Sequence, residues 1–141
     1  MVLCSGAFDG LHAGHVRYLA AAKRLCDTQG EERPQQQEPL YVAVAPDRYI
    51  VDAKGRKPRW IQADRWRVVM QVQGVTQAYP SEHASIAEDI VKLKPRLFVK
   101  GVDWAGKIPD DVRAACREAG TQIVFVDTDG THTRDAYQDA E

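Results

Sequence analysis

Near its start the chain reads Ser5-Gly6-Ala7-Phe8-Asp9-Gly10-Leu11-His12-Ala13-Gly14-His15, between an apolar run at residues 2–4 and an amphipathic run that begins at Val16. This order is typical of a strand, a glycine-rich turn and a helix. Glycine lets the backbone turn tightly and approach a ligand closely. The N-terminus of a helix offers unpaired N–H groups and the positive end of the helix dipole, which together suit phosphate. The segment therefore predicts an anion site at the end of the first strand.

Two histidines stand out in this segment. His12 and His15 are three residues apart, so they share one face if both lie at the first helical turn. Two imidazoles aimed at one point above a helix N-terminus would clamp a phosphoryl group. One alternative is that the glycines only make a turn and the histidines are ordinary loop residues. A metal pair is another, but no third Cys, His or carboxylate stands nearby at a familiar ligand spacing, so we expect no protein-held metal.

The string G-A-F-D-G-L-H-A-G-H, followed by L-A-A-A-K, resembles the H-x-G-H signature of the cytidylyltransferase-like nucleotidyltransferases. That family includes glycerol-3-phosphate cytidylyltransferase and heptose-phosphate adenylyltransferases. The resemblance implies transfer of CMP from CTP, or AMP from ATP, to a phosphorylated small polyol or sugar, with release of pyrophosphate. It also implies Mg²⁺ bound with the nucleoside triphosphate, and a homodimer. The D-W-A-G-K string favours CTP, whereas K-G-R-K-P and V-K-G-x-D favour ATP; we expect CTP and keep ATP as the alternative.

The same resemblance implies three sets of site residues. We expect the catalytic residues to be His12, His15 and Lys54. We expect the nucleotide to contact Gly6, Ala7, Phe8, Asp9, Gly14, Asp103, Trp104, Thr131, His132 and Thr133. We expect the substrates to contact Arg56, Arg59, Arg65 and Lys100 as well.

Several of these residues also have a plain structural interpretation. The basic run Lys54-Gly55-Arg56-Lys57-Pro58-Arg59 would, on charge alone, be a solvated surface segment. Asp9 would either hold the turn or touch the ribose. Arg65 would be a surface residue if it does not face the site, and Trp104 would either stack on a ligand or pack in the core.

The end of the chain departs from the family pattern, which is close to R-T-x-G-I-S-T-T. Asp127 stands where an Arg would fall, His132 replaces the first hydroxyl, Thr133 is retained and Arg134 replaces the last hydroxyl. These changes keep open a second hypothesis, a nucleotide-binding sensor that has lost catalysis. A third is a nucleic-acid-binding module acting through residues 54–59, with steep salt dependence. A net charge of −1 argues against it, so we expect no nucleic-acid partner.

The order of elements predicts the fold class. Apolar runs suited to buried strands occur at residues 2–4, 40–45, 75–79, 97–99 and 122–126, and helical spacing occurs at 16–26, 64–73, 85–93 and 109–119. Strands that alternate with helices predict a Rossmann-like α/β fold, a five-stranded parallel sheet with helices on both faces. We expect a last helix after Thr133. At 141 residues we expect one domain, 1–141, with the Gln-rich segment 28–39 as a mobile surface insertion.

Composition limits the cellular setting. No apolar run approaches the roughly 20 residues that a membrane span needs. The first expected strand begins at Val2, which leaves no room for a signal peptide. Cys4, Cys26 and Cys116 are odd in number and far apart, which is typical of packed thiols in a reducing compartment. We therefore expect a cytoplasmic protein with no membrane partner.

Overall fold

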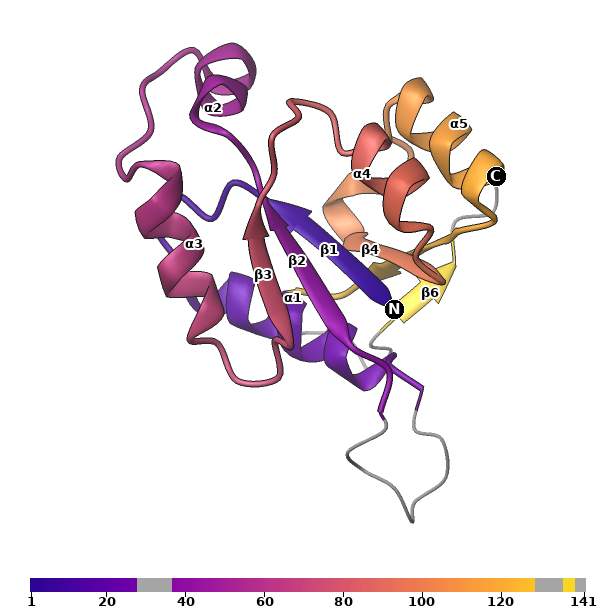
Figure 1. The fold of residues 1–141 in the computed structure, drawn as a ribbon. Coiled ribbons are helices and arrows are strands. Elements are labelled where there is room, and N and C mark those ends of the chain that lie inside the picture. The colour runs from indigo at the N-terminus through magenta and orange to yellow at the C-terminus, as the bar shows by residue number, and fades with distance from the viewer. Residues whose placement is uncertain (28–36, 129–135, 139–141) are drawn as a thin grey trace.

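The computed structural model describes residues 1–27 and 37–128 and the backbone of 136–138. Its sheet has the strand order β3-β2-β1-β4-β5-β6, in which the first five strands run parallel and β6 pairs antiparallel with β5 (Figure 1). The strands are β1 (Val2–Gly6), β2 (Leu40–Val44), β3 (Gln77–Pro80), β4 (Leu97–Gly101), β5 (Gln122–Val126) and β6 (Ala136–Gln138). The predicted five-stranded parallel sheet is confirmed. The expectation of a last helix after Thr133 is wrong, because residues 136–138 form strand β6.

Helices cover both faces of the sheet, as predicted (Figure 1). The helices of the described residues are α1 (Ala13–Arg24), α2 (Asp47–Lys54), α3 (Gln62–Met70), α4 (Ala87–Leu93) and α5 (Asp110–Ala119), with a short 3₁₀ helix, η2 (Val102–Trp104). Helices α1 and α3 pack on one face, and α4 and α5 pack on the other. Right-handed crossovers between parallel strands place them in this way.

Alternation along β1 divides the core into two layers. Val2 and Cys4 point to the face covered by α1, where they meet Leu19. Leu3 points to the opposite face, where it meets Ile90 of α4. All five of these side chains, that of Cys4 included, are fully buried. A strand buried on both faces must be apolar throughout, which is why this run lacks polar alternation.

Helix α2 was not predicted. Pro46 precedes its first residue, Asp47 lies in its first turn, and Gly55 ends it in a left-handed conformation with φ 65°. Ile50 is the buried residue of this helix, so the sequence offers no repeated apolar stripe to reveal it. Lys54 consequently lies at the end of a helix and not in a loop.

The start of α4 also differs from prediction. Helix α4 begins at Ala87, although the Ser85 hydroxyl still accepts a hydrogen bond from the Ala87 N–H at 3.2 Å.

The Gln-rich segment 28–39 lies mostly outside the described residues. At its edges the Glu38 N–H donates to the Asp27 carbonyl at 2.8 Å, which ties the two ends together.

Candidate active site

The strand order reverses between β1 and β4, so crossovers from these two strands leave the sheet in opposite directions. Ligands of open α/β sheets collect at the carboxyl ends of strands at such a point. A cavity of about 500 Å³ opens there. The predicted site residues that line it are Gly6, Ala7, Phe8, Asp9, His12, Gly14, His15, Lys54, Arg56, Arg59, Lys100, Asp103 and Trp104. The topology thus gathers residues from β1, α1, α2, β4 and η2, and from the loops after β1 and α2, at one place.

His12 and His15 form a stacked pair at the start of α1. Their ring centroids are 3.9 Å apart and their planes differ by 27°. The Nδ1 of His12 accepts from the Gly14 N–H at 3.0 Å, and the Nδ1 of His15 accepts from the His12 N–H at 3.2 Å. A neutral imidazole that accepts at Nδ1 carries its proton at Nε2. The helix cap therefore turns both rings into Nε2–H donors.

The environment of His15 keeps its ring neutral. Burial, with the Phe8 ring 5.3 Å away, is the main cause that lowers the pKa of His15 to about 4, and the neighbouring His12 and Lys54 contribute in the same direction. At neutral pH this side chain therefore acts as a hydrogen-bond donor and not as a cation.

Two glycines of the signature are required by the rings around them. A Cβ on Gly14 would lie 2.9 Å from Cε1 and 3.1 Å from Nδ1 of His12, because that ring folds back over the first turn. A Cβ on Gly6 would lie 2.9 Å from the ring of Phe8, whose own backbone is left-handed with φ 51°. The glycines thus make room for the aromatic and imidazole rings that shape the cavity.

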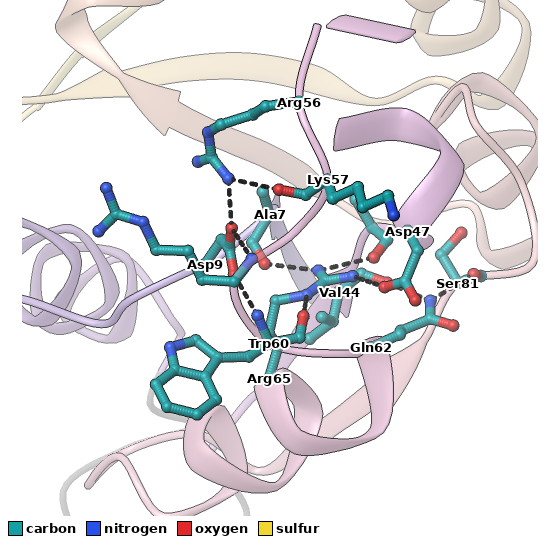
Figure 2. Close-up of polar contacts among 12 residues, drawn as sticks. Ala7, Asp9, Val44, Asp47, Arg56, Lys57, Trp60, Gln62, Arg65 and Ser81 are labelled. Carbon is teal, nitrogen blue, oxygen red and sulfur yellow. Dashed lines mark hydrogen bonds and ion pairs between the residues drawn. The ribbon is translucent and has the colours of Figure 1, made fainter. Parts of the chain in front are cut away.

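Asp9 fixes the basic loop that follows α2 (Figure 2). Its carboxylate accepts from Arg56 Nη1 at 2.8 Å, from the Arg59 N–H at 2.8 Å and from the Trp60 N–H at 2.9 Å. Burial alone would raise the pKa of Asp9, but these hydrogen bonds and the charge of Arg56 lower it to about 2. Asp9 therefore holds Arg56 and the backbone at Arg59 beside the histidines, and its contact with a nucleotide stays a prediction.

Arg65 is placed differently from the prediction. Its side chain is fully buried and does not line the cavity. The guanidinium donates to the carbonyls of Trp60 (2.9 Å), Ala7 (2.7 Å) and Ala45 (2.8 Å), and to Asp47 Oδ1 at 2.6 Å (Figure 2). Arg65 therefore joins three loops behind the site instead of contacting a substrate, and its assignment to substrate binding is corrected.

Lys100 lies on the opposite wall, at the end of β4. Its Nζ donates to the Ser5 carbonyl at 3.0 Å and lies 4.7 Å from the centroid of the Trp104 ring. Burial lowers the pKa of Lys100 to about 8, while Cys4 and Asp103 act in the opposite direction. The Trp104 ring face therefore supports a half-buried ammonium group, in addition to lining the cavity.

The turn after β4 depends on Gly101. A Cβ there would come within 2.6 Å of Asp103 Oδ1 and 3.2 Å of Thr128 Cγ2. Glycine lets the carboxylate of Asp103 fold back toward the end of the strand, where it lines the cavity.

Two tyrosines of the site were not predicted. Tyr18 lies one helical turn after His15, and its hydroxyl donates to the Val99 carbonyl and accepts from the Ser5 N–H at 3.3 Å. Because Tyr18 follows His15 by three residues, the sequence already indicated that the two side chains share one helix face. Tyr49 lines the cavity from α2, a helix the sequence did not reveal.

Thr131, His132 and Thr133, which the sequence places against the nucleotide, lie outside the described residues, as does Arg134. Within the described part of the chain, no three His, Cys, Asp or Glu side chains are arranged to hold a metal ion. Among the helices described, none has the length and apolar character needed to cross a bilayer.

Comparison with known proteins gives relatives over most of the chain. The bifunctional protein HldE of Gluconacetobacter diazotrophicus is 35% identical over 133 residues, which is 92% of this chain and 25% of that protein. The FAD synthase of Korarchaeum cryptofilum is 32% identical over 105 residues, covering 74% of this chain and 65% of that protein. The chain thus spans about a quarter of the length of the HldE relatives it matches.

Solved structures give the same fold. The lipopolysaccharide core biosynthesis protein from Thermoplasma volcanium superposes with a TM-score of 0.66 at 23% identity, covering 86% of this chain and 89% of that one. The sequence model described as cytidylyltransferase-like matches residues 3–135. The chain therefore belongs to the cytidylyltransferase-like family.

Proposed function

We propose that the protein is a nucleotidyltransferase. A phosphate oxygen of a small phosphorylated acceptor attacks the α-phosphorus of a nucleoside triphosphate, the bond between the α-phosphorus and the bridging oxygen breaks, and pyrophosphate leaves. The observation that carries this proposal is the pair of stacked Nε2–H imidazoles at the start of α1, in a cavity that also contains Lys54, Arg56 and Arg59. Donors fixed in advance toward one anionic centre suit the charge that develops on a transferred phosphoryl group.

Each side chain has a role that follows from its placement. His12 and His15 donate from Nε2 to oxygens of the α- and β-phosphates. Lys54, Arg56 and Arg59 neutralise the β- and γ-phosphates. Since the attacking group is already an anionic phosphate oxygen, no side chain need remove a proton. The protein holds two mutually repelling anions together, which supplies proximity as well as electrostatic stabilisation.

The donor we propose is ATP, with CTP as the alternative. The relative named FAD synthase makes, by its name, a compound in which an AMP unit is joined to a flavin phosphate. The D-W-A-G-K string of this chain favours CTP, whereas the K-G-R-K-P and V-K-G-x-D strings favour ATP. Both triphosphates therefore belong in the assay.

Magnesium fits this site as a companion of the nucleotide. Asp9 and Asp103 are the carboxylates among the described lining residues, and Asp9 is occupied by the loop that it holds. Mg²⁺ keeps several waters and is commonly bound through substrate phosphates with one or two carboxylates, so Asp103 is the residue that would help to hold it. When bound, the ion supplies charge neutralisation on the phosphates.

The test is a pyrophosphate-release screen of four nucleoside triphosphates against a panel of sugar, polyol and other organic phosphates. The resemblance implies a polyol or sugar phosphate as acceptor, and both are included. His15→Ala should reduce turnover by about 10²–10³ while the protein stays folded. An unchanged rate in a folded variant would reject the assignment of His15.

A catalytically altered nucleotide sensor is the second candidate, favoured by Asp127 where the family pattern has an Arg. Such a protein would bind ATP or CTP in a calorimeter yet release no pyrophosphate with any acceptor. The homodimer implied by the resemblance is a separate proposal. Light scattering of the purified chain decides it, because a dimer has twice the mass of one chain.

A further inference from the structure

A second cavity, of about 360 Å³, lies on the face of the sheet that α4 and α5 cover. We name it the acceptor chamber and define it by its apolar walls, Ala43, Ile86, Phe98, Ile108 and Val112. Phe98 and Ala43 come from the sheet, and Val112 comes from α5. The chamber is therefore formed by the same layer of side chains that packs the core on this face.

The chamber joins the cavity that contains the histidines. Ser5, Gly6, Tyr49, Lys100 and Trp104 line both. Among the described residues that line the chamber, Lys100 is the one lysine or arginine, and its Nζ is held at the boundary by the Ser5 carbonyl at 3.0 Å. A phosphate that lies beside Lys100 would thus face the histidine pair, with the rest of its molecule in the chamber.

Three polar side chains of the chamber, those of Ser81, His83 and Ser85, are engaged within the protein. Ser81 Oγ donates to Asp89 Oδ2 at 3.1 Å, and Ser85 Oγ donates to Asp111 Oδ2 at 2.5 Å. His83 pairs through Nδ1 with Glu88 at 2.8 Å. A polyhydroxylated ligand would exchange its water hydrogen bonds for apolar contacts here, which is unfavourable. An apolar ligand would be buried without that cost.

We propose that the acceptor chamber selects a phosphate monoester whose organic part is aromatic or branched aliphatic, and that Lys100 holds its phosphate at the junction with the nucleotide cavity. This inference deepens the proposed function and rests on it. It replaces the polyol or sugar implied by the resemblance with an acceptor of different chemical class. Lys100 is then a positioning contact for the attacking phosphate.

The test measures binding of 1-naphthyl phosphate, 1-naphthol, glycerol 3-phosphate and inorganic phosphate to the full chain by fluorescence and calorimetry. 1-Naphthyl phosphate should bind at least about tenfold more tightly than glycerol 3-phosphate, because burial of an aromatic body is worth that much or more. Lys100→Met should weaken 1-naphthyl phosphate and leave 1-naphthol unchanged. Equal or tighter binding of glycerol 3-phosphate overturns the proposal.

A blocking variant tests the location. Ala84 is exposed and lines the chamber, so Ala84→Phe fills its mouth without disturbing the core. Ala114 is exposed on α5 and lies outside both cavities, which makes Ala114→Phe the matched control. Ala84→Phe should weaken 1-naphthyl phosphate at least about tenfold, with the affinity for ATP or CTP unchanged. Unchanged binding of the naphthyl ester in this variant overturns the proposal.

The two proposals fail in distinguishable ways. If the triphosphate binds in a manner that depends on His15 but 1-naphthyl phosphate shows no preference, the chamber proposal alone is wrong. If no triphosphate binds, the nucleotidyltransferase proposal is wrong, whatever the chamber binds.

Discussion

Substituting Gly14 by Ala should separate stability from activity. The added Cβ would lie 2.9 Å from Cε1 and 3.1 Å from Nδ1 of His12, so the ring must move and its hydrogen bond from the Gly14 N–H is lost. Loss of a side-chain cap costs about 1 kcal/mol. Ala in place of Gly returns about 0.5–1 kcal/mol in a helix. The free energy of unfolding should therefore change by less than about 1 kcal/mol.

Activity should respond much more strongly to the same change. A displaced His12 removes one preorganised donor, and loss of such a donor costs about 10²–10³ in turnover. We expect Gly14→Ala to lower kcat/KM for pyrophosphate release by about 10²-fold, with a Tm shift of no more than about 4 °C.

Two variants serve as controls for this experiment. His12→Asn keeps a side chain that caps helices well but removes the imidazole, so it should match the activity loss of Gly14→Ala with little change in Tm. Ala13→Gly lowers helix propensity in the same turn without crowding His12, so it should retain activity. If Gly14→Ala keeps wild-type kcat/KM, the placement of His12 by the helix cap has no catalytic importance and the reasoning is refuted.

Three further predictions concern stability. Arg65→Met should lower the free energy of unfolding in urea by about 3–5 kcal/mol, because it leaves three carbonyls and a carboxylate without their donor. The control Arg67→Met, at an exposed ion pair, should lower it by less than about 0.5 kcal/mol. Equal losses in the two variants would contradict the buried network. Asp9 has a folded pKa near 2, below its usual value of 3.8, so the stability it confers is present above pH 3.8 and lost as the pH falls toward 2. Asp9→Asn should therefore show a shallower loss of unfolding free energy over that range than wild type, and parallel curves would argue against the loop contact. The pKa of His15 is lowered from 6.5 to about 4, so as the pH drops from 6.5 to 4 the unfolded chain binds the proton first and the folded state loses stability. His15→Asn should therefore make the dependence of Tm on pH flatter across that window. An unaltered dependence would count against a buried, neutral ring.

The sheet and the histidine signature could be predicted because their signals are local. An apolar strand, three glycines and two histidines follow one another within residues 2–15, and the hydrogen bonds that orient the rings join residues no more than three apart. The parallel order then places the loops after β1 and β4 at one edge, which gathers the rest of the lining. Local sequence was therefore sufficient to predict how the two histidines are placed at the start of α1.

The supporting network could not be predicted in this way. Arg65 bonds to Ala7 and Ala45, which are 58 and 20 residues away in the chain. Nothing in the sequence around Arg65 distinguishes a buried guanidinium from one that points to solvent. The hydrogen-bond partners of Asp9 likewise lie 47 to 51 residues later in the chain. Such contacts depend on how loops meet in space, which propensity and periodicity do not encode.

The most direct test of the central claim is ¹⁵N NMR of the histidine side chains at neutral pH, with and without a non-hydrolysable triphosphate. The structure predicts that His12 and His15 both accept a hydrogen bond at Nδ1 and carry a proton on Nε2, that the His15 ring is neutral, and that the triphosphate shifts the Nε2 resonances of both rings together. Protons on Nδ1, or Nε2 signals that do not respond to the triphosphate, would contradict the account.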